Sequence, residues 1–404
     1  MRVAVLGLGQ RGTLYADIIR DKHSDCEIVA VCDTETYRLT KAKELYGVSD
    51  DMLFSNEQDF FEQGKIADVL LICTMDRAHY TQTVKAMELG YDVLLEKPMS
   101  PNEEECRDMI SVAEKCGRKL AICHVLRYTP YYSEIKKRIV KGEIGQIVTI
   151  SQTENVGYWH QAHSFVRGNF RNTQEASPMI LQKCCHDLDI IRWLMDKSCR
   201  AVSSFGSLTY YTKENAPVGA AERCLDCTAD CIYNAPKWYK SEQGKSWYVG
   251  TRLGIEDVDE GMRVLPHGRC VFQCDNDVVD HQVVNMLFEG GATAQLTMTA
   301  FSERNYRYIH IHGTAGEIVG DMEAGYFDVI TFGKGTERVD ITGLGIDLSG
   351  HGGGDIKLVR DFLDYVKGNG DVLSSARASL ESHLMAFTAE KSRKSGGQVF
   401  NVLL

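Results

Sequence analysis

The sequence predicts an α/β protein with an N-terminal doubly wound parallel sheet and a C-terminal α/β domain built on a mostly antiparallel sheet. Three observations lead to this fold class. Apolar strands without alternation, separated by helical patterns, fill the first 125 residues. Alternating, turn-linked strands follow them. The 404 residues, 44% of them hydrophobic, are too many for one core, so we expect domains at 1–125 and 126–404.

In the first domain, short apolar runs alternate with helical patterns. The predicted strands cover residues 2–7, 28–31, 69–73, 92–95 and 120–123. The predicted helices follow a glycine-rich segment after residue 7 and cover 38–45, 79–89 and 103–116. Strands that are apolar on both faces are typical of a parallel sheet covered by helices on each side.

The second domain begins with a predicted helix at 132–141. Turns such as the one at 289–291 separate its strands, which favours antiparallel pairing. The predicted strands cover 147–152, 281–288, 292–301, 308–312 and 317–321, and helices at 356–367 and 376–394 end the chain.

Composition excludes several classes of function. The chain has 45 Lys and Arg against 56 Asp and Glu, a net charge of −11, so we expect no nucleic-acid partner. Its apolar runs are shorter than the roughly 18 residues that span a bilayer, and its first residues do not resemble a signal peptide. Most cysteines are scattered, as in reduced proteins. We therefore expect a cytoplasmic protein without a membrane partner.

Gly7-x-Gly9-x-x-Gly12 follows the first strand and opens a helix. This pattern permits a tight turn, a close approach of pyrophosphate to the backbone and close helix–strand packing. Backbone N–H groups near Gln10 and Arg11 would point at the phosphates. The segment therefore predicts a dinucleotide site.

Asp33 ends the second strand, 21 residues after Gly12. A carboxylate at this place accepts hydrogen bonds from a ribose 2′-OH and repels the 2′-phosphate of NADP. The sequence therefore favours NAD as the cofactor. Glu96-Lys97-Pro98 ends the fourth strand, where Lys97 could hold a substrate hydroxyl, or could be a solvated lysine paired with Glu96.

Taken together, these motifs resemble the Gfo/Idh/MocA family of oxidoreductases. The resemblance covers nearly the whole chain and rests on the GxGxxG start, Thr74 with His79, Glu96-Lys97-Pro98, Arg127-x-x-Pro130, Gly142-x-x-Gly145 and His186-x-x-Asp189.

The resemblance implies an N-terminal Rossmann domain and a C-terminal α/β domain with a large open sheet often used in oligomer contacts. It also implies NAD(P)-linked oxidation of sugars or cyclitols, in a homodimer or homotetramer. Lys97 and His186 are carried over as catalytic residues, and Thr74, His79 and Glu96 as cofactor neighbours.

The chain departs from the family pattern before His186. The family commonly has an aspartate four residues earlier, where this sequence has Gln182, which can bind a sugar hydroxyl but cannot act as a base. Burial and the charge of Lys97 would favour a neutral amine on Lys183, making it a candidate base. The alternative is a surface lysine on a helix.

Several further side chains are candidates for substrate binding. The donor-rich segment 160–169 contains His160, His163 and Arg167, which suit a polyhydroxylated or anionic substrate, or are simply solvated. His124 and Arg127 follow the fifth strand and should lie near the nicotinamide, although Arg127 could instead be structural.

A cysteine-rich insertion is predicted around 215–275. Cys224-x-x-Cys227-x-x-x-Cys231 with Cys270 or Cys274 has the density of a structural zinc site. An iron–sulfur cluster and a loop of reduced cysteines are the alternatives.

The first hypothesis for function is an NAD-dependent oxidoreductase acting on a CH–OH group of a small-molecule carbohydrate. The second is a redox-neutral glycosidase or lyase that recycles NAD through a 3-keto sugar and needs another base, for which Lys183, His160 and His163 are candidates. The third is a non-catalytic NAD-responsive protein, which Gln182 would favour.

Overall fold

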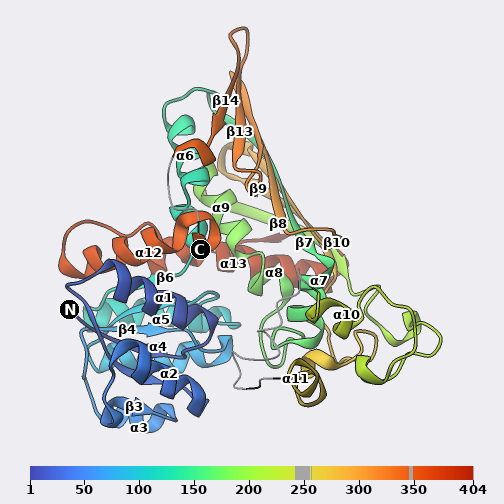
Figure 1. Cartoon of the computed structure of the whole chain (residues 1–404). Helices are drawn as coiled ribbons and strands as arrows, with labels where there is room; N and C mark the ends of the chain where they lie inside the picture. The colour runs from blue at the N-terminus through green and yellow to red at the C-terminus, as the bar shows by residue number, and fades with distance from the viewer. Residues whose placement is uncertain (242–254, 256, 345–348, 404) are drawn as a thin grey trace.

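Two sheets, each with its own covering helices, make up the molecule (Figure 1). The structure is a computed structural model and describes residues 1–241, 255, 257–344 and 349–403. Within these residues no helix combines the length and the apolar character that a membrane crossing requires.

The first sheet is parallel and has the strand order β3-β2-β1-β4-β5-β6 within the described residues. Its strands are β1 (Arg2–Leu6), β2 (Glu27–Cys32), β3 (Leu53–Phe54), β4 (Val69–Ile72), β5 (Asp92–Leu95) and β6 (Leu120–Ile122). The predicted doubly wound sheet is therefore confirmed, and the short strand β3 is an addition to it.

Helices cover both faces of this sheet, which explains why its strands are apolar throughout. The helices after β1 to β6 are α1 (Gln10–Lys22), α2 (Thr36–Tyr46), α3 (Glu57–Glu62), α4 (His79–Glu88), α5 (Glu103–Cys116) and α6 (Pro130–Val140). Along β1, Val3 and Val5 pack toward α1 and α2, while Ala4 and Leu6 pack toward α3, α4 and α5. Gly117 follows the last residue of α5 and ends the helix in a left-handed conformation, with a φ of +61°, which glycine adopts without strain.

The second sheet is mostly antiparallel, with strand order β14-β13-β12-β11-β7-β10-β9-β8-β15 and a parallel β10–β7 pair among the described residues. Its strands are β7 (Ile147–Gly157), β8 (Cys199–Ser207), β9 (His281–Phe288), β10 (Thr293–Ser302), β11 (Tyr306–Gly313), β12 (Gly316–Asp321), β13 (Tyr326–Thr331), β14 (Gly335–Asp340) and β15 (Phe400–Asn401). The predicted class of this domain is confirmed. The prediction did not include β8, β13, β14 or β15.

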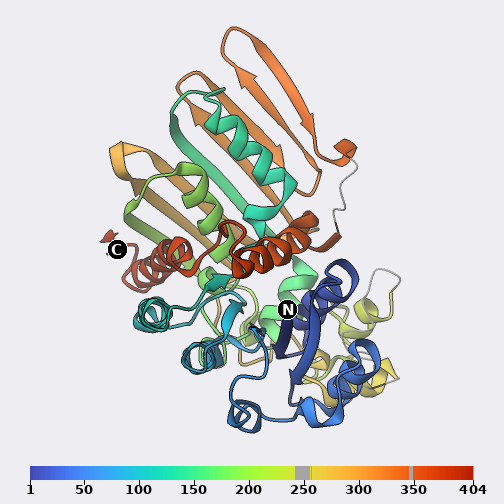
Figure 2. The same ribbon diagram turned by 90° about the vertical axis from the view of Figure 1, so that its left-hand side faces the viewer.

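One face of the second sheet packs against helices and the other is open (Figure 2). The remaining helices are α7 (Tyr158–His160), a π-helix (Gln161–Arg167), α8 (Met179–Gln182), α9 (Cys185–Met195), α10 (Ala235–Tyr239), α11 (Val258–Val264), α12 (Ser349–Lys367) and α13 (Ala376–Lys394). Residues of β11 alternate: Ile309 and Ile311 are fully buried, whereas Tyr308 is 42% exposed on the open face.

The C-terminal helices return to the first sheet and join the two halves (Figure 2). Leu358, Val359 and Phe362 of α12 share a hydrophobic core with β1 and α1. The Ile122 N–H at the sheet edge donates to the Ser374 carbonyl at 2.8 Å, just before α13. Nε2 of His383 on α13 accepts from the Met99 N–H at 2.9 Å.

Candidate active site

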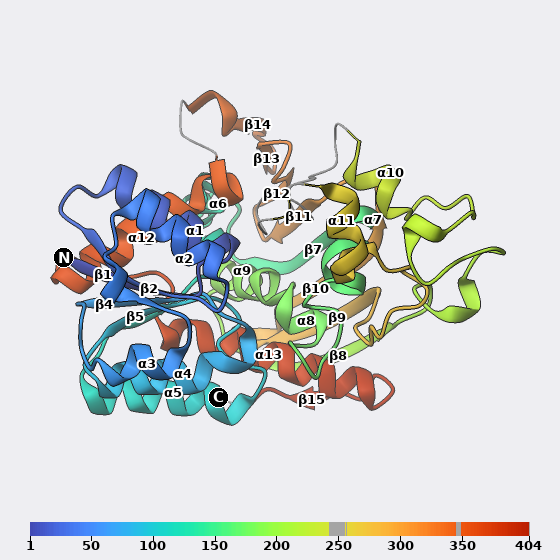
Figure 3. The same cartoon turned by 60° about the horizontal axis from the view of Figure 1, so that its bottom comes forward.

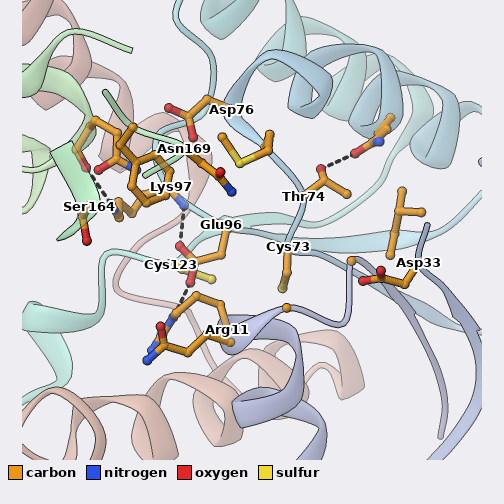
Figure 4. Close-up of a pocket in the computed structure, with 18 of the residues that line it drawn as sticks. Arg11, Asp33, Cys73, Thr74, Asp76, Glu96, Lys97, Cys123, Ser164 and Asn169 are labelled. Carbon is orange, nitrogen blue, oxygen red and sulfur yellow. Dashed lines mark hydrogen bonds and ion pairs between the residues drawn. The ribbon is translucent and has the colours of Figure 1, made fainter. Parts of the chain in front are cut away.

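A cleft of about 860 Å³ runs along the carboxyl edge of the first sheet. Loops after β1, β2, β4 and β5 form one wall, and α7, the π-helix, α8 and α9 contribute to the other. In Figure 4, Asp33 lies at one end, while Lys97, Ser164 and Asn169 lie at the other. This position is where doubly wound sheets hold their ligands.

The glycine-rich segment lies against the sheet edge. Gly7 has a φ of +89°, and a Cβ built there would lie 2.7 Å from the Cys73 carbonyl oxygen, so glycine is required. A Cβ built on Gly9 would come no closer than 4.0 Å to another residue's atoms, here Arg38 Nη1, and Gly9 lines the cleft as Gln10 does. An open glycine turn at a helix N-terminus fits a pyrophosphate group. The shape of this turn is thus compatible with the predicted dinucleotide site.

Asp33 is 6% exposed and lines the cleft beside this turn. Its carboxylate accepts from the Leu8 N–H at 2.7 Å and the Glu35 N–H at 2.9 Å. Arg38 Nη1 lies 3.1 Å from the same carboxylate and also lines the cleft. The sequence prediction included Asp33 but not Arg38, which stands five residues later on α2.

The Arg11 side chain belongs to a cluster of charged residues, whereas the sequence prediction concerned only its backbone N–H. Its Nε donates to Glu96 Oε1 at 2.8 Å, and its Nη2 pairs with Asp355 of α12. Tyr15 donates to the same oxygen of Glu96 at 2.8 Å. Burial alone would raise the pKa of Glu96, but Arg11 and Lys97 bring it below its usual value. The Arg11 side chain therefore belongs to this ionised cluster, and the predicted phosphate contact concerns only its backbone N–H.

Lys97 and His186 meet in the cleft, as the resemblance implied. The Nζ of Lys97 donates at 2.6 Å to the carbonyl of Gln182, the last residue of α8, four residues before His186 on α9. Burial, followed by the charge of Lys97, lowers the pKa of His186 well below its ordinary 6.5. Its Nδ1 is buried and has no hydrogen-bond partner among the described residues. A neutral imidazole thus faces the same cleft as an ammonium donor (Figure 4 shows Lys97).

Lys183 lines the cleft, and its amine is paired with a buried carboxylate. Its Nζ lies 2.9 Å from Oε1 of Glu154, which is 1% exposed. Arg307 reaches the other oxygen of Glu154 at 2.7 Å and contacts Asp187 at 3.0 Å. Glu154 therefore holds the Lys183 amine in an ion pair, a contact that the prediction of a neutral base beside Lys97 did not include.

Two histidines predicted near the cofactor lie behind the cleft. Both ring nitrogens of His79 face carbonyl oxygens, Nδ1 that of Pro98 at 2.7 Å and Nε2 that of Thr74 at 3.2 Å. His79 is fully buried and supports the turn that carries Lys97. His124 is 1% exposed and packs edge-on against the His186 ring, with centroids 5.9 Å apart. Neither belongs to the lining of the cleft.

Arg127 is structural, the alternative that the sequence left open. Its Nε and Nη2 donate to the two oxygens of Asp189 at 2.7 and 2.6 Å, and its Nη1 donates to the Leu373 carbonyl at 2.7 Å. These bonds join the first domain's edge to α9 and to the segment before α13. The expected contact of Arg127 with substrate is therefore not supported.

The donor-rich segment 160–169 is largely helical, not a loop. His160 lines the cleft, with Nδ1 3.1 Å from Asn305 Oδ1. His163 instead lies 2.6 Å from the Tyr239 hydroxyl, outside the lining residues. Arg167 donates to the carbonyls of Arg269 and Tyr233, both at 2.6 Å, and so holds the insertion in place. His163 and Arg167 were wrongly expected in the substrate wall.

Several cleft residues were missed by the sequence analysis. The donor-rich composition of residues 160–169 could have suggested Ser164 and Asn169, whereas the others lie on a helix, a strand or a turn without a local signal. The missed residues are Arg38, Cys73, Asp76, Cys123, Ser164, Asn169 and Arg307. His351, which α12 brings to the cleft, lies 3.0 Å from Asp355.

The described part of the cysteine-rich insertion contains α10 and α11 and lies on the side of α7 (Figure 3). Cys224 accepts from Arg167 at 3.5 Å, and the Tyr233 N–H points at Cys231 Sγ at 3.4 Å. Among the described residues, no three cysteine sulfurs approach within 4.8 Å of one another. The predicted zinc site, with Cys224, Cys227, Cys231 and Cys270 or Cys274, is not supported by this geometry.

Comparison with known proteins bears on this cleft. Residues 1–124 match a family model described as "Oxidoreductase family, NAD-binding Rossmann fold". Residues 136–400 match the model described as "Oxidoreductase family, C-terminal alpha/beta domain". Both models carry the Gfo/Idh/MocA name.

Two curated relatives and one solved structure illustrate the likeness. D-glucoside 3-dehydrogenase of Escherichia coli is 30% identical over 36% of this chain and 41% of its own length. Inositol 2-dehydrogenase 4 of Saccharopolyspora erythraea is 26% identical over 50% of this chain and 56% of its own length. The WlbA dehydrogenase of Bordetella pertussis, solved with NADH and UDP-GlcNAcA, has a TM-score of 0.72 at 17% identity, covering 100% of this chain and 98% of its own. The chain thus spans about half the length of these two curated relatives, and the solved structure shares its fold.

Proposed function

The chain belongs to the Gfo/Idh/MocA oxidoreductase family, and from this premise we propose that it is an NAD-dependent dehydrogenase of a sugar, glycoside or cyclitol hydroxyl. The single observation that carries the proposal is the meeting of Lys97 and His186 in one cleft, at the far end from Asp33. This arrangement separates a nucleotide end from a reacting end.

The residues present fit NAD. The open turn at Gly9 accepts a pyrophosphate, and Asp33 faces the place of a ribose hydroxyl. When bound, the nicotinamide supplies the hydride acceptor. The chain itself orients the substrate and moves the proton.

Lys97 and His186 divide the remaining work. One Lys97 N–H is taken by the Gln182 carbonyl, so its other two can hold the substrate oxygen and stabilise negative charge there. His186 is neutral at pH 7 because burial and Lys97 lower its pKa. It can therefore accept the hydroxyl proton while the carbinol carbon loses its hydride.

A polyhydroxylated substrate suits the wall opposite the sheet. Ser164, Asn169 and Gln182 offer neutral donors and acceptors there. The positive charges of Lys183 and Arg307 are paired with the carboxylates of Glu154 and Asp187. The named relatives act on a glucoside and an inositol. We therefore place the substrate among neutral or weakly charged carbohydrates.

The test is a panel of sugars, glycosides and inositols incubated with the enzyme and NAD. A dehydrogenase accumulates NADH in proportion to a ketone product. The redox-neutral alternative would release aglycone and exchange the C2 hydrogen in D₂O without net NADH. The ion pair with Glu154 occupies Lys183, one of the three candidate bases for that alternative. NADH-free aglycone release would refute the dehydrogenase proposal.

We also propose that a second copy of the chain covers the open face of the second sheet, giving a homodimer or homotetramer. Exposed apolar side chains support this: Leu287, Phe301 and Tyr308 are 44%, 45% and 42% exposed. Light scattering of the purified protein tests it, and a monomer at micromolar concentration would refute it.

A further inference from the structure

Two histidines and a glutamate gather on the β11–β12 hairpin, on the open face of the second sheet and away from the cleft. His310 and His312 are two residues apart on β11, so their side chains leave the same face of the sheet. Glu317 on β12 is paired in register directly opposite His312. The hairpin thus fixes three potential ligands by backbone pairing alone.

The side-chain atoms of the three residues converge. Nε2 of His310 lies 2.6 Å from Oε2 of Glu317, and Nδ1 of His312 lies 3.3 Å from the same oxygen. All three ligand atoms lie within 4.8 Å of one another. Among the described residues this is the one set of three His, Cys, Asp or Glu side chains with this spacing.

We propose that His310, His312 and Glu317 bind a divalent transition-metal ion of the zinc type. Imidazole nitrogen and carboxylate oxygen are typical zinc ligands at about 2.0–2.2 Å, which places tetrahedral ligand atoms roughly 3.3 Å apart. The His312–Glu317 distance already has this value, and His310 needs to move by less than about 1 Å. Magnesium and calcium prefer all-oxygen sites and do not fit this donor set.

Exposure and charge also favour a cation here. The three side chains are 29%, 42% and 25% exposed, so an ion can enter without crossing the core. Nε2 of His310 and Nδ1 of His312 both face Oε2 of Glu317. A bound cation would accept a lone pair from each of these three atoms at once. All three ligands come from one chain, whether or not a second copy covers this face. Three protein ligands leave a fourth position for water.

The experiment uses the full-length protein after removal of metals with a chelator, titrated with Co²⁺ and then Zn²⁺. Cobalt distinguishes the site from the cysteines, because a nitrogen–oxygen site gives visible d–d bands without the near-ultraviolet thiolate bands. We expect each wild-type chain to bind one more metal ion than the double variant His310→Asn/His312→Asn. Glu317→Gln should weaken binding by at least about tenfold.

The matched control is His281→Asn, which removes a half-exposed histidine of β9 beside Asp280 and should bind as the wild type does. Circular dichroism of the metal-free variants verifies the fold. Equal metal stoichiometry in the wild type and the double variant, or cobalt spectra with thiolate bands alone, would overturn the proposal. Neither readout depends on dehydrogenase activity.

Discussion

Replacing Lys97 with methionine should slow the reaction while leaving cofactor binding intact. Methionine keeps much of the length of the lysine side chain but removes its ammonium group. Two N–H groups of that ammonium are not used by Gln182 and would serve the substrate oxygen. Loss of one such donor typically costs about 10²- to 10³-fold in kcat, equivalent to about 3–4 kcal/mol. The Asp33 end of the cleft is untouched, so the affinity for NAD should change little.

The same variant should also shift the pH profile. Lys97 helps to lower the pKa of His186, after burial itself. The acidic limb of kcat/KM should therefore lie below pH 6.5 in the wild type and move to higher pH in Lys97→Met. A merely structural role for Lys97 would not move this limb.

The assay measures NADH formation from pH 5 to 9 and NAD affinity by calorimetry. It compares the wild type, Lys97→Met and a control variant. The matched control is Lys141→Met, an exposed lysine after α6 that should leave both quantities unchanged. A kcat within about threefold of the wild type, or an unshifted acidic limb, would refute the assignment of Lys97.

Three further predictions concern charge. Asp33→Ala should weaken NAD binding and raise the ratio of NADP to NAD turnover in steady-state assays. The reason is that Arg38 loses its carboxylate partner and can face a 2′-phosphate. An unchanged ratio would contradict this prediction. Arg127→Met should lower the free energy of unfolding in urea by about 3–5 kcal/mol, because Asp189 is left buried without its cation; a loss below about 1 kcal/mol would contradict it. Burial raises the pKa of Asp187 from 3.8 to about 6, so the folded state binds this proton more tightly. The stability from this group is therefore lost as pH rises from about 4 to about 6, and urea titrations of Asp187→Asn should show a flatter pH dependence across that window.

Much of the first domain could be predicted because its signals are local. The run of apolar residues at 69–73, the glycines after β1 and the carboxylate at Asp33 each report their own environment. In the second sheet, β14 was missed because its residues are nearly all exposed and polar. It is held by pairing with β13, which no pattern within β14 reveals.

The site was predictable where a residue's role follows from the element that carries it. Lys97 follows the parallel strand β5 by two residues, and the carboxyl edge of such a sheet places it in the cleft. Lys183 could not be assigned from the sequence, because the carboxylate that pairs with it comes from Glu154, in a strand 29 residues earlier. Arg167 was likewise assigned to substrate when its partners are carbonyls about 66 and 102 residues away.

The return of α12 and α13 to the first sheet has a consequence for how the chain folds during synthesis. Residues 1–125 leave the ribosome long before Ser374 can bond the edge strand or Phe362 can cover β1. Until then, the nascent nucleotide-binding half lacks part of its apolar cover. A fragment ending near residue 125 should therefore aggregate when expressed alone, and adding a separate peptide that contains α12 and α13 should restore its solubility.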